Sequence, residues 1–467
     1  MKRTRILCWI FLSGTLFARY ARSAETGWHA DPVAGLLIAL VVILAAAKLG
    51  SELFERLGQP AVLGELIVGV VLGNLVLVDP SWGFFEPLRM PEITEPWALE
   101  IDSLSRLGIL ILLFEVGLES SLKMMVSVGT SASLVAVLGV IAPFVLGYGA
   151  SAVFIKTLPV ELAAVVPAGF SLGYVHMFTG AVLCATSVGI TARVFKDLGK
   201  LQTREAQIIL GAAVIDDVLG LIVLALVSGI VGAAETGQVM DLAGLLGLIA
   251  KALGFLGGAL AVGSYLVPRV MKQLARLRTA GVMLISAVLF AFLLSYLAIA
   301  AGLAGIVGAF AAGLLLEKVH FQDFREELTI EKLIKPIADL LTPLFFVLMG
   351  IQVHLETFTQ WPVLGVAAAL TLAAVIGKQV CGLGVLEKAV DRLTVGLGMI
   401  PRGEVGLIFA GIGRELRVLD AAIFSAVVIM VIVTTLITPP VLKLALARHE
   451  KREPRPDSPG SRPEEVK

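Results

Sequence analysis

The chain has 467 residues, of which 57% are hydrophobic and only 16% are charged. Soluble domains usually carry about 25% charged residues, so this composition excludes a soluble globular protein and predicts an all-α, polytopic membrane protein. The formal net charge is zero, which gives no global attraction to nucleic acid. Three cysteines and five histidines, without metal-ligand spacing, predict neither a disulfide framework nor a metal cofactor.

Residues 1–24 begin with Lys2, Arg3 and Arg5, continue with a short apolar run and end with small residues. This pattern is typical of a signal peptide, whose cleavage would leave the mature N-terminus outside the cell. The alternative is a retained helix, which the short apolar length disfavours.

Thirteen further segments have the apolar length and the flanking breaker residues of membrane-spanning helices. They cover about residues 33–56, 60–79, 98–119, 128–154, 173–196, 204–231, 243–270, 279–299, 302–317, 335–352, 361–387, 391–413 and 420–446. We therefore expect a transmembrane unit over residues 33–446, followed by a short, disordered tail over residues 447–467.

The distribution of Lys and Arg among the connections predicts the orientation of the chain. If the N-terminus is outside, most of these cations lie in cytoplasmic connections, whereas the external connection 79–102 is acidic. Thirteen spans with a cytoplasmic C-terminus satisfy this rule, and an even number would break it. The predicted location is the cell membrane, of the bacterial inner-membrane type.

Two stretches indicate an internal repeat. Leu63–Leu72 and Val307–Leu316 both have glycines five residues apart, and the next segment in each half ends alike, at Leu113–Leu118 and Phe346–Ile351. The matching segments run in opposite directions, as in secondary transporters built from inverted repeats. Chance similarity between Gly-rich apolar helices is the alternative.

Two adjacent carboxylates, Asp216 and Asp217, interrupt the apolar run from Ile208 to Val227. Ionisable residues at membrane depth are costly and usually mark a path for ions or protons. Neighbouring helical side chains point in different directions, so one aspartate can face an ion path while the other faces a partner. A carboxylate in this position can hold either a proton or a hard cation, and that competition is sufficient for exchange.

Lys378 is a cation in the middle of the apolar run Val363–Leu386. Ionisable residues at such depth are normally paired, and the two aspartates are the candidate partners. The alternative is that Lys378 extends to a membrane interface.

Thr186 and Ser187 place hydroxyl groups in the middle of the fifth segment. If the helix breaks near Gly189, these hydroxyls and the freed carbonyl groups could coordinate a dehydrated cation. In an intact helix they would instead bond to the carbonyl groups one turn earlier.

Four further charged residues lie at the level of the predicted spans. Arg402 and Glu404 form either a pair at the membrane interface, without functional weight, or a charged network around the core. Glu65 and Glu115 either line a cavity and support that network or make contacts between helices.

Taken together, these features resemble the monovalent cation:proton antiporter-2 family of sodium/proton and potassium/proton exchangers. The matching stretches follow the family order and are Pro60–Gly73, Leu113–Glu119, Ala185–Arg193, Gly211–Leu221, Pro343–Gly350, the Gly377-Lys378 pair and Pro401–Gly406.

The resemblance implies a homodimer in which each subunit has a dimerisation domain and a mobile core, with two crossed discontinuous helices in the fifth and eleventh segments. It also implies that Asp217 is the main group that binds cations and protons. Asp216 would pair with Lys378 in one state and release it when the cation binds. Family members with two adjacent aspartates at this position are generally electrogenic, so the resemblance also implies electrogenic exchange.

No Gly-rich phosphate loop is present, so nothing indicates use of ATP or an enzymatic function. Many potassium-efflux relatives carry a cytoplasmic nucleotide-binding domain, for which the tail here is too short. The alternative functions are a sodium-coupled symporter of a small organic anion with a related inverted-repeat fold, and a channel or sensor.

Overall fold

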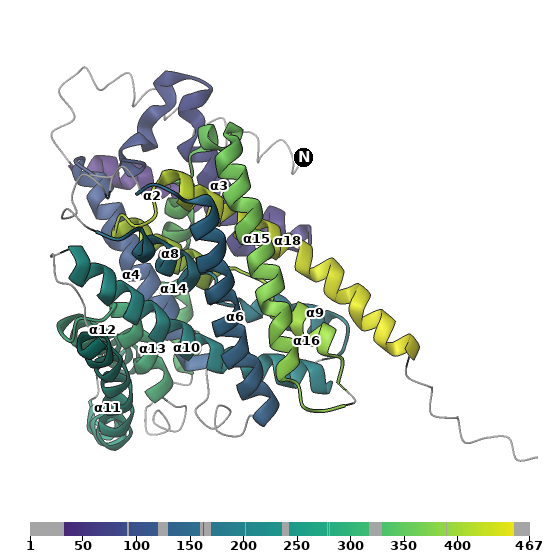
Figure 1. Cartoon of the computed structure of the whole chain (residues 1–467). Coiled ribbons are helices and arrows are strands. Elements are labelled where there is room, and N and C mark those ends of the chain that lie inside the picture. Colours follow the sequence, from purple (N-terminus) through teal and green to yellow (C-terminus); the bar gives the residue numbers. More distant parts are fainter. Residues whose placement is uncertain are drawn as a thin grey trace, which may run out of the picture.

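The computed structural model describes residues 32–452, except for 91–92, 120–128, 159–161, 163–169, 201, 236–241, 278, 280, 317–328 and 389. Within these residues the chain is helical and has no strand, which confirms the all-α class (Figure 1). The signal-like segment 1–24 lies outside the described residues. At the other end, α18 (Ala421–Arg452) continues six residues beyond 446, and the remainder of the predicted tail lies outside the described residues.

The helices form two groups. The first group, which we call the frame, contains α2 (Pro32–Arg56), α3 (Ala61–Gly73), α4 (Pro96–Glu119), α11 (Leu242–Leu274), α12 (Val282–Ala300), α13 (Gly305–Leu315) and α14 (Ile330–Ile351). Helix α14 packs against α3 and α4, and α13 packs against α4 and α12. Two short 3-10 helices, η1 (Leu75–Leu77) and η2 (Pro80–Leu88), follow α3.

The second group, which we call the core, contains α6 (Thr130–Phe154), α8 (Leu172–Val182), α9 (Val188–Asp197), α10 (Arg204–Glu235), α15 (Trp361–Cys381), α16 (Arg392–Gly398), α17 (Glu404–Glu415) and α18. Helix α6 packs against α8, α10 and α15, and α15 also packs against α18. The short helix η4 (Leu355–Thr359) connects α14 of the frame to α15, and η5 (Gly382–Gly384) follows α15.

Two spans of the core are broken. Residues 183–187 separate α8 from α9, and residues 399–403 separate α16 from α17. In the second break, Pro401 has no backbone N–H and disfavours a helical conformation in the residue before it. The two breaks meet, because the backbone N–H of Ser187 donates to the carbonyl oxygen of Pro401 at 2.9 Å.

The second break does not lie in the eleventh predicted segment, as the family resemblance implies, but in the twelfth. The eleventh segment forms the continuous helix α15, which runs through Lys378 to Cys381. Gly377 serves packing there and not unwinding, because a Cβ atom on it would lie 2.7 Å from the backbone of Pro143 in α6. Glycine therefore lets α15 approach α6 closely.

Eight helices in the described part of the chain are long and apolar enough to cross a membrane, or nine if the bent pair Ala61–Leu77 and Trp82–Leu88 is one span. The other predicted segments contain short or broken helices or, in α4, a helix with several charged residues. Multiple membrane spans are thus present, and the count of thirteen stays a prediction.

Glycines bring the frame helices into backbone contact. At each of the four glycines in the predicted repeat, an added Cβ atom would lie only 2.1–2.2 Å from a carbonyl oxygen of a neighbouring helix: Gly64 against Gly50 in α2, Gly69 against Val347 in α14, Gly308 against Leu294 in α12 and Gly313 against Phe114 in α4. Such contacts exclude any side chain and fix the spacing of the helices.

Contacts between the frame and the core are of a different kind. Among the glycines of the described helices, Gly411 of α17 faces the other group, and its added Cβ atom would meet the side chains of Met349 and Phe345 in α14. No backbone of α14 is among its nearest atoms. The two groups therefore meet through side chains that can move.

Candidate functional site

Asp216 and Asp217 lie in the middle of α10, with α6 and α8 packed against that helix. The side chain of Asp216 is completely buried, whereas Asp217 is partly exposed. The two side chains point in different directions, as helical geometry requires of neighbouring residues, and they therefore have different surroundings.

Lys378 of α15 pairs with Asp216. Its Nζ atom donates to Oδ1 of Asp216 at 3.0 Å, to Oδ2 at 3.3 Å and to the carbonyl oxygen of Cys184 at 2.9 Å. Lys378 is completely buried, which excludes the alternative that it extends to an interface. Three acceptors around one ammonium group compensate for its removal from water.

Gly139 of α6 makes room for this pair. A Cβ atom at this position would lie 3.3 Å from Nζ of Lys378 and 3.5 Å from Oδ1 of Asp216. Sequence analysis missed Gly139, because nothing in the apolar sequence around it shows which helix it faces.

The carbonyl groups freed by the first break are bound by two buried cations. Lys378 takes that of Cys184, and Nη1 of Arg402 donates to the carbonyl oxygen of Ala185. Arg402 is itself completely buried in the second break, where its own carbonyl oxygen accepts a hydrogen bond from Thr435 at 2.7 Å. Its Nε and Nη2 atoms have no partner among the described residues.

Glu404 begins α17 and accepts a hydrogen bond from the hydroxyl of Ser187 at 2.6 Å. Arg402 and Glu404 bind different groups, so the interpretation of these two residues as a pair at the membrane interface is wrong. They belong to the charged network at the crossing of the two breaks.

The hydroxyl of Thr186 is buried and has no hydrogen-bond partner among the described residues. Neither Thr186 nor Ser187 bonds to a carbonyl group one turn earlier, because the helix is absent at both positions. The alternative of an intact helix is therefore wrong. The two hydroxyls lie in the break, as the interpretation of a discontinuous span requires.

The two remaining acidic candidates belong to the frame. Glu65 of α3 accepts a hydrogen bond from Ser51 of α2 at 2.9 Å, so it makes a contact between helices and does not join the network at the breaks. Glu115 is partly buried on α4. Neither residue contacts the aspartates through a hydrogen bond or ion pair given by the structure.

Asp217 makes no hydrogen bond or ion pair with any described residue. The charges that act on it most strongly are those of Asp216, Glu404 and Lys378. Since Lys378 is paired with Asp216, Asp217 is the carboxylate of the two that lacks an ion-pair partner among the described residues. Such a group can accept a proton or a hard cation.

Comparisons with known proteins identify the family of the chain. The model of the transmembrane sodium/hydrogen exchanger family matches residues 36–448. A high-affinity Na⁺/H⁺ antiporter of Synechocystis, NhaS3, is 38% identical, covering 96% of this chain and 98% of that protein. The Na⁺/H⁺-K⁺ antiporter GerN of Bacillus cereus is 35% identical over 88% of this chain and 96% of its own length.

Among solved structures, the sodium/proton antiporter MjNhaP1 of Methanocaldococcus jannaschii has a similar fold, with a TM-score of 0.60 over 89% of this chain and 98% of that chain. Because only 18% of the aligned residues are identical, this comparison shows a similar fold and nothing more. The symporter alternative finds no support in these comparisons. The chain belongs to the transmembrane sodium/hydrogen exchanger family and is a secondary cation/proton exchanger.

Proposed function

We propose that Asp217 is the group at which Na⁺ or K⁺ and the proton compete during exchange. The observation that carries this proposal is the contrast between two adjacent carboxylates. Asp216 is buried and paired with Lys378 at 3.0 Å, whereas Asp217 has no ion-pair partner among the described residues that would supply a countercharge. A proton or a monovalent cation supplies that countercharge, and binding of one displaces the other.

The other ligands of the cation come from the break in the fifth span. The hydroxyl of Thr186 is buried without a partner, and that of Ser187 is directed at Glu404. Hydroxyl and carboxylate oxygens suit a hard monovalent cation. They accommodate both sodium and potassium, and the relatives named above include antiporters of both kinds.

Asp216 and Lys378 act as a switchable ion pair. When a cation binds at Asp217, the repulsion between the two carboxylates is screened, and Lys378 is free to release Asp216. Loss of a proton from Lys378 together with one from Asp217 would make exchange electrogenic. The completely buried position of the pair supports this role, since charge changes there are felt strongly at Asp217.

Transport proceeds by movement of the core relative to the frame, and the two halves of the chain form an inverted repeat. The matched glycines of α3 and α13 support the repeat, because each helix uses its pair to contact one neighbour from its own half and one from the other half. The N-terminus faces outside and the C-terminus faces the cytoplasm, as the distribution of cations predicts.

The functional unit is a homodimer. Helix α11 lies at one edge of the molecule (Figure 1) and is largely exposed. Gly254, Gly257 and Gly258 have open space where a Cβ atom would lie. Small residues on an exposed membrane helix permit close approach of a second helix, which supports α11 as part of the subunit interface.

The proposal is tested by reconstituting purified protein in liposomes with a pH-sensitive dye and adding Li⁺, Na⁺ or K⁺ at several pH values. Asp217→Asn keeps the size of the side chain but removes its charge, and it should abolish exchange with every cation. Asp339→Asn is the matched control, because Asp339 lies in the frame helix α14 and pairs with Lys335 of the same helix at 3.5 Å. It should retain exchange. Normal exchange by Asp217→Asn would refute the assignment.

A further inference from the structure

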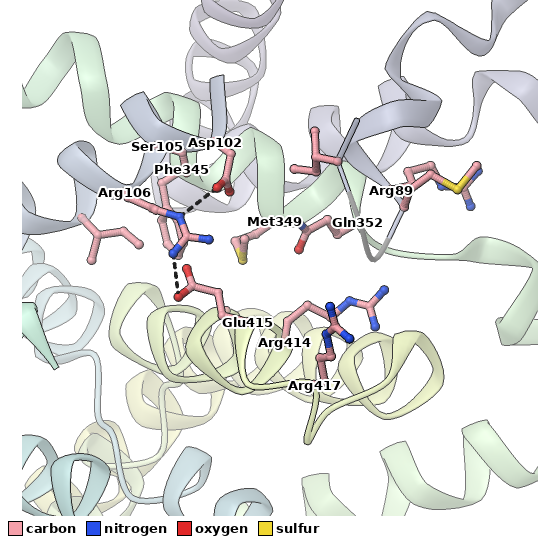
Figure 2. A pocket seen from close by; sticks show the side chains of 14 residues that line it. Arg89, Asp102, Ser105, Arg106, Phe345, Met349, Gln352, Arg414, Glu415 and Arg417 are labelled. Atoms are coloured by element: carbon pink, nitrogen blue, oxygen red, sulfur yellow. Dashed lines mark hydrogen bonds and ion pairs between the residues drawn. The ribbon is translucent and has the colours of Figure 1, made fainter. Parts of the chain in front are cut away.

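An ion pair joins the frame helix α4 to the core helix α17. Arg106 of α4 donates from Nε to Oδ2 of Asp102 at 2.8 Å, within the same helix, and from Nη1 to Oε2 of Glu415 at 3.0 Å (Figure 2). Glu415 is the last residue of α17, whereas Arg106 lies on the opposite side of the boundary between the groups. The guanidinium group therefore bridges that boundary.

A cavity of about 160 Å³ lies beside the pair. Its walls come from both groups, with Ser105 and Gln352 on the frame side and Gly411 and Arg414 on the core side (Figure 2). Oε1 of Gln352 is buried and has no hydrogen-bond partner among the described residues. A polar cavity whose walls belong to two bodies must open or close when one body moves relative to the other.

Each partner of the ion pair is fixed in its own group. An added Cβ atom on Gly108 of α4 would lie 2.5 Å from the carbonyl oxygen of Leu341 in α14, and one on Gly413 of α17 would lie 2.6 Å from the ring of Phe178 in α8. Displacement of the core must therefore separate Arg106 from Glu415, because neither helix can follow the other group.

Helix α17 connects this ion pair to the candidate ion site. Glu404 at its first residue binds Ser187 in the break, and Glu415 at its last residue binds Arg106. A helix of 12 residues spans about 18 Å and moves as one element. A change in the position of Glu415 at the C-terminal end of α17 therefore also changes the position of Glu404 at its N-terminal end.

We propose that Arg106 and Glu415 are positioning residues for the exchange reaction. They form a latch that holds α17 against the frame, keeps Ser105 in the cavity wall buried in the state described, and separates once in each transport cycle. Asp102 keeps Arg106 directed at Glu415. The inference rests on the proposed movement of the core, but its test does not require transport.

The test measures how fast a cysteine in the wall of the cavity reacts. Ser105→Cys is introduced in a Cys8→Ser background and labelled with a water-soluble maleimide in detergent. The two other cysteines, Cys184 and Cys381, are buried, and the Cys8→Ser protein without Ser105→Cys is the blank. Arg106→Gln and Glu415→Gln should each accelerate labelling by about threefold to fivefold, because an ion pair of this exposure shifts a two-state equilibrium only modestly. The double substitution should give no further increase.

Lys335→Gln is the matched control, because Lys335 pairs with Asp339 within the single helix α14 at 3.5 Å. It should leave labelling unchanged. The difference in labelling rate between Ser105→Cys alone and Ser105→Cys with Arg106→Gln should decrease at high concentrations of choline chloride, because salt screens exposed charges. Arg106→Lys, which keeps the charge, should label more slowly than Arg106→Gln.

Equal labelling rates of Ser105→Cys alone, with Arg106→Gln and with Glu415→Gln would overturn the latch, and so would additive effects of the last two substitutions. These outcomes are distinct from failure of the proposed function, which would appear as normal exchange by Asp217→Asn while labelling still responded to the latch substitutions.

Discussion

An ion pair inside the core and an ion pair at its boundary with the frame lie in opposite surroundings. Asp216 and Lys378 are completely buried inside the core, and a third acceptor satisfies the ammonium group. The side chains of Arg106 and Glu415 are 52% and 39% exposed at the boundary between frame and core. The first pair is expensive to break because it leaves a charge in a dry interior, whereas the second can be broken and solvated at little cost.

The packing follows the same division. Inside each group, glycines place helix backbones against each other, as at Gly69 in the frame and Gly377 in the core. At the boundary, Gly411 meets the flexible end of Met349. The difference indicates that the chain is rigid within each group and deformable between them, which is the arrangement that movement of one body along another requires.

The largest expected effect comes from breaking the pair inside the core. Lys378→Met leaves Asp216 buried without its partner and should lower the free energy of unfolding by about 3–5 kcal/mol. The double substitution of Lys378→Met with Asp216→Asn should recover much of this loss, because no charge is then stranded. Thermal unfolding of the purified protein measures both. A double variant as unstable as the single one would contradict this explanation.

The next effect tests the backbone contacts. Gly69→Ala places a Cβ atom 2.1 Å from the carbonyl oxygen of Val347, which belongs to a helix backbone and cannot move aside. The substitution should destabilise the protein by about 1–3 kcal/mol. Gly149→Ala in α6 is the control, because its Cβ atom would meet nothing within 4 Å. Equal stability of the two variants would show that the frame is not held by close backbone contact.

Much of this division follows from sequence patterns. Apolar length predicted helices in every segment, and the cost of charges at membrane depth singled out Asp216, Asp217 and Lys378. The depth of Lys378 also predicted a pair with one of the aspartates. The choice of Asp216 required the family resemblance, because helical periodicity shows only that the two aspartates point apart. Residues near the breaks were identified through their hydroxyl groups and through the resemblance.

What sequence could not provide depends on contacts between distant segments. The family resemblance placed the second break in the eleventh segment, but Gly377 there serves close packing against α6, and Pro401 breaks the twelfth segment instead. Arg402 and Glu404, two residues apart, have different partners because Arg402 lies in the break and Glu404 begins α17. The bridge from Arg106 to Glu415 joins residues about 300 positions apart, and no local pattern indicates it.

At the boundary between frame and core, a substitution should affect the rate of exchange more than the free energy of unfolding. Gly411→Ala brings a Cβ atom 3.0 Å from Sδ of Met349, which can move away, so the free energy of unfolding should change by less than about 1 kcal/mol. Exchange should slow by up to about tenfold, since about 1.4 kcal/mol in the moving state has that effect. Gly413→Ala, two residues further along and facing Phe178, should lower stability instead. The reverse ranking would place the sliding surface elsewhere.

The smallest effect is a pH dependence in the connection between the groups. His354, at the start of η4, faces Arg89, Glu356 and Arg414, and Nη2 of Arg89 lies 3.1 Å from its Nδ1. Burial, followed by the charge of Arg89, lowers the pKa of His354 below its ordinary value of 6.5, although Glu356 opposes this shift. Just below pH 6.5 His354 is therefore protonated more readily in the unfolded chain than in the folded one. Neutral His354 thus stabilises the fold fully above that pH, and this stabilisation is lost as the pH falls towards the lowered pKa. His354→Gln should reduce the fall in melting temperature between pH 8 and pH 5.5. If the melting temperature of the variant depends on pH as that of the unaltered protein does, His354 is not the group responsible.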